Sequence, residues 1–198
     1  MGHMVGRSIA GTVVAGRSTK DAIRDAAIEL FTSKGFEQSS LREVADAVGI
    51  TKASLYYHYA SKVDLLIAII QPMVDDLREL VESLDEIPHS PQTVREVLES
   101  HLRSILGHRT AGTLCMRDTV AILNALGDRY PDMIELSRRM CRWLAGPGAD
   151  DETTLRAAAA MQVLSAALMS QESVPNASEE LIGGVLLEAA LGVLNSPR

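Results

Sequence analysis

Four hydroxyl-bearing residues in the first third of the chain stand directly before runs of helical periodicity and divide that region into short helices. A serine or threonine in this position accepts hydrogen bonds from the free backbone N–H groups of a first helical turn. Gly35 and Gly49 follow the first two runs, and glycine readily takes the left-handed conformation that ends a helix. The cap positions are Ser18, Ser40, Thr51 and Ser61. They predict helices over about 19–34, 41–48, 52–59 and 61–84.

The remainder of the chain continues the helical pattern. Pro72 falls inside the fourth predicted helix, where it is expected to cause a bend. No stretch shows the sustained alternation of β-branched residues that is typical of a strand. Further helices are expected at about 91–108, 111–126, 131–145, 151–172 and 178–195. The sequence therefore predicts an all-α fold of about nine helices.

Charge is unevenly distributed along the chain. The formal net charge is −7, but residues 1–62 hold eight Lys or Arg against six Asp or Glu, a net of +2. Residues 63–198 hold eleven against twenty, a net of −9. All four lysines and five of the seven aromatic residues lie before position 63. The two parts are therefore expected to be domains with different partners.

Three segments follow from this division. Residues 1–17 are Gly-rich and without periodicity, which predicts a flexible arm, and its first four residues resemble a cloning scar. Residues 18–62 form the first domain and residues 63–198 the second. The apolar stretch at 9–15 is too short and Gly-rich for a signal peptide, and no run is long enough to span a membrane.

Patterns that indicate catalysis or metal binding are missing from the sequence. Cys115 and Cys141 form no CxxC pair, which favours two small buried residues in a reduced, cytoplasmic protein. His101 and His108 share a helix face but are separated by about 10.5 Å along the axis, too far for one ion. No Walker loop, GxSxG or HExxH occurs. We expect no enzyme activity, no cofactor and no metal.

Residues 40–59 place two short helices around the tight turn at Gly49. Such a helix–turn–helix can present its second helix to the major groove of DNA while the first crosses the backbone. Small residues at the start of the second helix allow close approach to base edges, and nearby cations and hydroxyls suit phosphate oxygens. The pattern alone has a plain alternative, because helix pairs joined at glycine are common in all-α proteins.

The residues of this segment resemble the DNA-binding domain of tetracycline-repressor-type (TetR family) transcriptional regulators. The resemblance covers about residues 19–66 and rests on runs at 26–31, 35–36, 39–45, 48–59 and 61–62. Its most specific part is Leu55-Tyr56-Tyr57-His58-Tyr59, followed by Ser61 and Lys62. Tyr59 stands where phenylalanine is usual in the family. Beyond this segment only the number and length of the helices agree.

The resemblance implies roles for individual residues. Ser40 and Arg42 are expected at the phosphate backbone, and Thr51 both caps the second helix and donates to a phosphate. Lys52, Ala53 and Ser54 are expected to read bases. Tyr56, His58 and Lys62 are expected to bind phosphates, and Tyr57 is expected to pack partly while offering its hydroxyl.

The aromatic and basic residues of this segment also have plain alternatives. Aromatic side chains at helical spacing are usually core residues, an interpretation we accept for Tyr59. Adjacent rings at Tyr56 and Tyr57 point about 100° apart on a helix, so at least one is expected to be exposed. Lys52 and Lys62 could simply be solvated.

The last two predicted helices have the composition of a dimer interface. Residues 181–194 contain a single charge, so that helix is expected to be buried on more than one side. Gly183 and Gly184 each cost about 1 kcal/mol of helix stability, which favours close helix approach as their purpose. Together with the preceding helix they predict a four-helix bundle across a two-fold axis. A monomer with a central C-terminal helix is the alternative.

Between the two ends the helices provide apolar residues that suit an adaptable effector cavity. Arg117 interrupts an apolar run, so it either reaches solvent or meets a ligand anion. The candidate ligand-binding residues are Met73, Leu77, His101, Arg103, Met116, Arg117, Val120, Met140, Trp143 and Met161. A filled Met/Leu core remains an equal interpretation.

The resulting hypothesis is a homodimeric regulator that binds a palindromic double-stranded DNA operator and is released by a small-molecule effector of unknown identity. Repression is expected, with activation open. The rival hypothesis is an all-α enzyme or carrier whose N-terminal segment does not bind DNA.

Overall fold

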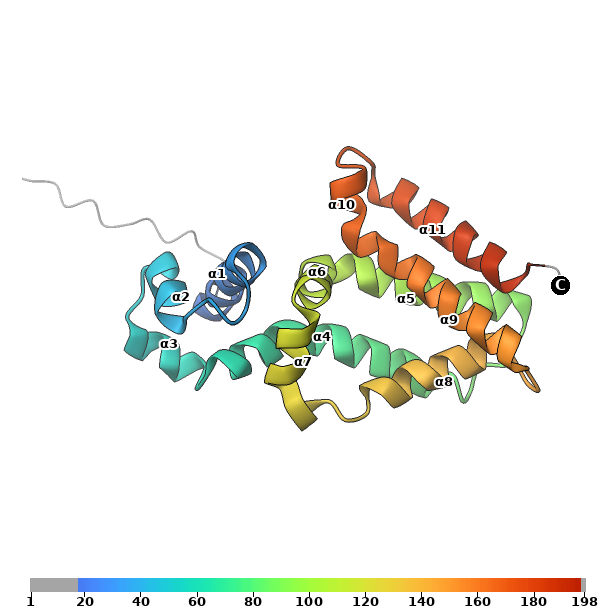
Figure 1. The fold of residues 1–198 in the computed structure, drawn as a ribbon, viewed down its shortest axis with the longest axis horizontal. Helices are drawn as coiled ribbons and strands as arrows, with labels where there is room; N and C mark the ends of the chain where they lie inside the picture. Colours follow the sequence, from blue (N-terminus) through green and yellow to red (C-terminus); the bar gives the residue numbers. More distant parts are fainter. Residues whose placement is uncertain (1–17, 197–198) are drawn as a thin grey trace, which may run out of the picture.

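The computed structural model describes residues 18–196, apart from the side chain of Asp128. All regular structure in this part of the chain is helical and none of it is strand, which confirms the all-α prediction (Figure 1). The arm predicted over residues 1–17 lies outside the described residues. The helices are α1 (Thr19–Lys34), α2 (Leu41–Val48), α3 (Lys52–His58), α4 (Lys62–Ser83), α5 (Pro91–Gly107), α6 (Arg109–Arg117), α7 (Thr119–Leu126), α8 (Met133–Ala145), α9 (Asp151–Ser165), α10 (Ser170–Ser173) and α11 (Glu179–Leu194). Within residues 18–196, none of them is both long and apolar enough to cross a membrane.

All four predicted caps form. Each side-chain oxygen accepts a hydrogen bond from the backbone N–H three residues later, at Asp21, Glu43, Ser54 and Asp64 respectively. Gly49 ends α2 with φ +75°, in the left-handed region that glycine occupies without steric cost. The predicted boundaries of α1 to α4 therefore agree closely with the structure, and α4 continues as helix through Pro72.

The helix expected over 111–126 is instead two helices, α6 and α7, separated at Asp118. Asp118 has φ −123° and ψ 39°, outside the helical region. Its Oδ2 atom accepts a hydrogen bond from the backbone N–H of Phe36, at 2.8 Å. The interruption allows the carboxylate to reach the α1–α2 loop, a contact across 82 positions that periodicity cannot reveal.

The helix expected over 151–172 is also interrupted, because α9 ends at Ser165 and a 3₁₀ turn (Ala166–Met169) leads into the short α10. The carbonyl oxygen of Leu168 in this turn accepts a hydrogen bond from Thr113 of α6, at 2.9 Å. Ser170 also donates to a carbonyl within the turn, that of Ala167, at 2.7 Å. These bonds compete with continuation of the α-helix.

Two clusters of buried apolar residues divide the molecule. One, the head cluster, contains α1–α3, the first half of α4, and residues of α6 and α7 that include Leu114 and Ile122. The other, the body cluster, contains the end of α4 with α5, α8, α9 and α11. Figure 1 shows α1–α3 at one end of the molecule, with α4 running from them into the remaining helices. The charge division at residue 62 therefore falls at the start of a helix that both clusters share.

Helices α9 and α11 pack against each other and leave an apolar surface uncovered. Leu155 of α9 is 70% exposed and Val185 of α11 is 60% exposed, and Leu181 is similarly accessible. A Cβ atom added at Gly184 or Gly192 would meet nothing within 4 Å, so both glycines face open space. This apolar face with small residues is called the α9–α11 face below.

The hydroxyl of Tyr59 is buried without a hydrogen-bond partner among the described residues. Its ring is only 5% exposed, and burial raises the pKa of the phenol. Removing an unsatisfied buried hydroxyl while retaining the ring should stabilise the fold. We predict that Tyr59→Phe raises the free energy of unfolding by about 1 kcal/mol, with a corresponding increase in Tm measured by circular dichroism.

Tyr130→Phe is the matched control. The Tyr130 hydroxyl donates to Gln71 Oε1 at 2.7 Å, so its removal should lower stability. Equal effects of the two substitutions would contradict the assignment of Tyr59 as an unsatisfied group.

Candidate nucleic-acid interface

The α2–turn–α3 unit is built from local hydrogen bonds. The Ser40 hydroxyl donates to Glu43 Oε2 at 2.8 Å, and the same carboxylate oxygen accepts from the Ser40 backbone N–H at 2.9 Å. After the turn at Gly49, the Ile50 N–H donates to the Ala45 carbonyl at 3.0 Å. Thr51 then caps α3 through the Ser54 N–H, at 3.1 Å. These bonds fix where α3 starts relative to α2.

Helix α3 has one buried side and one exposed side. Leu55 is completely buried, and Tyr59 at the end of the helix packs in the head cluster. Lys52, Ala53 and Tyr56 are exposed, and Tyr57 is 87% exposed. The expectation that at least one of the two adjacent tyrosines faces solvent is thus confirmed, and Tyr59 is confirmed as a core residue.

The exposed side of α3 carries ring and cation contacts that run along its surface. Lys52 Nζ lies 5.4 Å from the centroid of the Tyr56 ring. The rings of Tyr57 and His58 meet edge to face with centroids 5.4 Å apart. Ser54 and His58 are half-buried beside them. Cationic, hydroxyl and aromatic groups are therefore combined on one narrow helix surface.

The predicted contact residues on α2 differ in how strongly other side chains of the protein engage them. Arg42 is exposed, and its Nε lies 3.9 Å from Asp46 Oδ2, a weak exposed pairing. Ser40 is exposed but its hydroxyl is engaged in the capping box. Glu43 also pairs with Lys34 of α1. The Lys34 and Ser40 side chains together hold the pKa of Glu43 at about 2, so the carboxylate that ties α2 to α1 stays ionised.

Lys62 has an orientation that the sequence does not indicate. Its Nζ donates to the carbonyl oxygens of Phe36, Glu37 and Ser39 at 2.7, 3.1 and 3.0 Å. The ammonium also lies 4.4 Å from the centroid of the Phe36 ring. Because an ammonium has three donors, all of them are occupied. The phosphate contact expected for Lys62 stays a prediction, and this geometry favours a positioning role for Lys62 in the α1–α2 loop.

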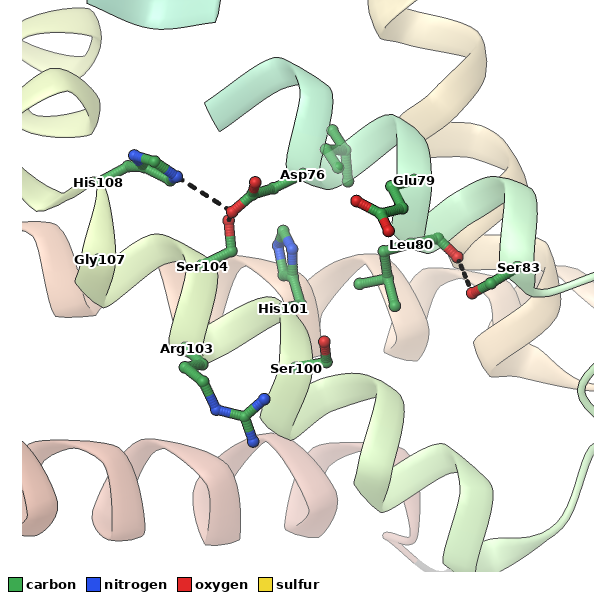
Figure 2. A pocket seen from close by; sticks show the side chains of 11 residues that line it. Asp76, Glu79, Leu80, Ser83, Ser100, His101, Arg103, Ser104, Gly107 and His108 are labelled. Carbon is green, nitrogen blue, oxygen red and sulfur yellow. Dashed lines mark hydrogen bonds and ion pairs between the residues drawn. The ribbon is translucent and has the colours of Figure 1, made fainter. Parts of the chain in front are cut away.

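Three of the predicted ligand-binding residues line one pocket of about 450 Å³ between α4 and α5. Leu77 comes from α4, and His101 and Arg103 from α5. Figure 2 shows His101 projecting toward α4, whereas Arg103 points away from it. Burial lowers the pKa of His101 to about 4, so its imidazole is neutral at neutral pH.

Asp76 of α4, which we did not predict as a site residue, organises this pocket. Its Oδ2 atom accepts from the Ser104 hydroxyl at 2.9 Å and lies 3.0 Å from His108 Nε2 (Figure 2). The seven-residue spacing of His101 and His108 indicated their shared helix face, but the partner on α4 depends on tertiary packing. Within residues 18–196, no group of His, Cys, Asp and Glu side chains is arranged to hold a metal ion.

The structure does not bring the other predicted ligand residues to this pocket. Met140 is completely buried in the body cluster, Met161 packs at its edge, and Met73 is half-buried on α4. Trp143 lines a separate pocket with His89. Met116 and Val120 are exposed, and Arg117 pairs with Glu172.

Burial also characterises the two cysteines. Both are free thiols: Cys141 is buried and Cys115 is half-buried. Burial raises the pKa of the Cys115 thiol to about 11, so it is protonated at neutral pH. Two inert apolar side chains agree with the interpretation of their spacing.

Comparison with known proteins agrees with the site geometry. Residues 23–69 match the family described as "Bacterial regulatory proteins, tetR family". This segment contains α2, α3 and the start of α4.

Curated relatives match mainly through the same region. The chain is 34% identical over 90 residues to the HTH-type transcriptional regulator AcrR of Shigella flexneri, covering 44% of this chain and 42% of that protein. It is 38% identical over 73 residues to the HTH-type transcriptional repressor KstR2 of Rhodococcus jostii, covering 35% of each. The matches thus span less than half the length of these relatives.

Solved structures extend the likeness to the whole fold. Mycobacterium smegmatis AmtR has 25% identity and a TM-score of 0.75, over 93% of this chain and 89% of that one. The TetR family regulator PfmR of Thermus thermophilus, at 22% identity with a TM-score of 0.62 over 92% and 99% of the two chains, shares the fold. AcrR, KstR2 and PfmR are each named as transcriptional regulators or repressors. Residues 23–69 are thus similar to the family of bacterial regulatory proteins described as tetR, and the fold of the whole chain is similar to that of solved regulators of this type.

Proposed function

We propose that this protein is a cytoplasmic, ligand-responsive transcriptional repressor that binds a palindromic DNA operator as a homodimer. The observation that carries the proposal is the exposed surface of α3, where Lys52, Ala53 and Tyr57 project from a helix held by the buried Leu55. These exposed side chains have no role in the packing of the head cluster within the described residues. A helix that enters a major groove needs such exposed side chains to contact DNA.

DNA contact is proposed for the residues of α2 and α3 and their caps. Arg42 and Thr51 contact phosphates, and Lys52 with Ala53 approaches base edges. The remaining proposed contacts are Ser40, Ser54, Tyr56, Tyr57 and His58. We assign Lys62 to positioning, because its donors already hold the loop between α1 and α2.

Dimerisation is proposed through the α9–α11 face. A single helix–turn–helix makes too few contacts for tight specific binding, and a two-fold dimer presents two recognition helices about 34–36 Å apart. Exposed Leu155, Leu181 and Val185 supply apolar area, while Gly184 permits close approach of a partner helix. The four helices would form a bundle across the axis.

Effector binding is proposed in the α4–α5 pocket. Leu77 and Leu80 provide an apolar wall, and the neutral His101 offers one donor and one acceptor. Because α4 also belongs to the head cluster, a ligand that prefers one position of α4 would shift the spacing of the DNA-binding heads. DNA and effector would then weaken each other's binding by the same factor.

Footprinting on DNA that flanks the protein's own gene tests the central proposal. We expect protection of two symmetric half-sites whose centres are separated by a whole number of helical turns, with affinity that falls steeply as salt rises. An unrelated sequence of the same length is the control. Equal affinity for both fragments would contradict operator recognition.

A charge on the α9–α11 face should separate the protomers. We predict that Val185→Glu raises the dimer dissociation constant by about a hundredfold or more, because two like charges would meet near the two-fold axis. Analytical ultracentrifugation measures this change. Ile134→Glu alters an exposed apolar residue of α8 and should leave the dimer intact; dissociation by both variants, or by neither, would contradict the proposed interface.

The two lysines should differ in how they affect DNA binding and stability. Lys52→Ala should lower the ratio of operator affinity to affinity for an unrelated fragment, with Tm unchanged, because a contact to base edges is lost. Lys62→Ala should leave the slope of log affinity against log salt unchanged but lower the free energy of unfolding by about 1–3 kcal/mol, since three carbonyls lose their charged donor. A reduced slope with an unchanged Tm in Lys62→Ala would instead show direct phosphate contact.

A further inference from the structure

A third cavity, of about 380 Å³, lies between α1 and the helices α5, α6, α10 and α11. Thr32 of α1 lines it from the head side, and Arg109, Thr113 and Arg117 line it from α6. The 3₁₀ turn after α9, α10 and the start of α11 complete the wall. The cavity is separate from the α4–α5 pocket, with which it shares only Gly107.

Arg109 is a buried guanidinium without a hydrogen-bond partner among the described residues. Its side chain is 11% exposed, and its Nε and Nη2 atoms are both buried and unbonded. The nearest carboxylate oxygen, Glu179 Oε1, is 3.9 Å from Nη2 and belongs to an exposed side chain. Burying a charge without hydrogen bonds is costly, so a residue in this state points to a ligand.

Thr32 independently indicates the same cavity. Its hydroxyl is buried and has no hydrogen-bond partner among the described residues. The neighbouring Thr113 differs, because its hydroxyl donates to the Leu168 carbonyl at 2.9 Å. One hydroxyl from α1 and one guanidinium from α6 therefore both have buried atoms without hydrogen bonds at the same cavity.

The charges and the wall specify what would fit. Two arginines and two glutamates line the cavity, so its formal charges balance. Arg117 is paired closely with Glu172, whereas Arg109 makes no hydrogen bond and lies 3.9 Å from Glu179. Leu106 and Leu168 give the wall an apolar part. An added Cβ at Gly112 would lie 2.6 Å from Leu168 Cδ2, so α6 and the Leu168 side chain of the 3₁₀ turn pack closely at this glycine.

We propose that this cavity binds a small carboxylate with a short apolar chain. The carboxylate accepts hydrogen bonds from the Arg109 guanidinium, a pairing for which arginine geometry is well suited. The Thr32 hydroxyl donates to the same anion, and the chain lies against Leu106 and Leu168.

Such a ligand would connect helix α1 to helix α6. Helix α1 packs against α6, and the Phe36 N–H already bonds Asp118 at the end of α6. An anion that contacts both Thr32 and Arg109 adds a second polar contact between α1 and α6. It holds α1 in the position that it has in this structure. Any effect on DNA affinity rests on the proposed function, but anion binding does not.

Isothermal titration calorimetry on the full chain tests the site with three probes of equal length: hexanoate, hexanamide and hexylamine. We expect saturable binding of hexanoate and none of the neutral amide or the cation under the same conditions. Equal binding of hexanamide would overturn the proposal, because it would show an apolar cavity that does not recognise charge. Absence of hexanoate binding would overturn it as well.

Substitutions test which side chains bind the carboxylate. Arg109→Met keeps the aliphatic length, and it should weaken hexanoate binding by about tenfold or more. Arg109→Lys should retain part of the affinity, and Thr32→Val should weaken it by a smaller factor without altering the fold. Arg138→Met removes an exposed arginine of α8 and serves as the control, with affinity unchanged.

Thermal unfolding gives a second readout for Arg109→Met. Hexanoate should raise the Tm of the wild type, since it binds only the folded state, and should not raise that of the variant. Without ligand the variant should be at least as stable as the wild type, because a buried guanidinium whose Nε and Nη2 lack hydrogen bonds is gone. Unchanged hexanoate affinity in both Arg109→Met and Thr32→Val would overturn the site.

The effect of hexanoate on DNA binding is measured separately, with the operator fragment. Hexanoate should change operator affinity in the wild type, and the operator should change hexanoate affinity by the same factor. Operator binding that hexanoate leaves unaltered, with hexanoate still bound, would overturn the coupling but not the site. Hexanoate binding without any operator binding would contradict the proposed function instead.

Discussion

Helix α4 buries its two ends in different apolar clusters, and the arrangement of the molecule depends on this. Leu65, Leu66 and Ile70 pack with the head, whereas Val81 and Leu84 at the other end pack with the body. The 22 residues of this helix span about 33 Å, and the helix continues through Pro72 without an intervening loop. In the proposed function, a displacement of the body end is transmitted along this helix to the helix–turn–helix.

Elements fixed by local interactions could be predicted from the sequence, and elements fixed by distant contacts could not. Ser40 and Glu43 cap α2 across three positions, so their spacing alone located the helix. Asp118 breaks a helix to reach Phe36, and the turn after Ser165 gives a carbonyl to Thr113; neither partner is visible to a periodicity argument. The change in charge at Lys62 likewise separated two parts of the chain by composition. It did not indicate that both parts share α4.

The same distinction applies to the sites. Exposure of Tyr57 and burial of Leu55 follow from helical geometry, so the exposed side of α3 could be predicted. Lys62 belongs to the same motif, yet it turns to carbonyls more than twenty positions earlier. Arg117 was expected either to reach solvent or to meet a ligand anion; its side chain is exposed and pairs with Glu172. Arg109, which lines the same cavity, is the one whose buried nitrogens lack hydrogen bonds among the described residues.

Pairing, more than net charge, separates structural cations from functional ones. In the acidic body, arginines such as Arg78, Arg139 and Arg156 each meet a carboxylate at about hydrogen-bond distance, and such exposed pairs contribute little beyond solubility. Lys52 on α3 has a ring beside it but no ion pair among the described residues. Arg109 has no hydrogen bond and is buried. An exposed cation without an ion pair suits a polyanion that arrives from solvent, and a buried cation without hydrogen bonds suits a small anion that must leave water. The net charge of −7 conceals both.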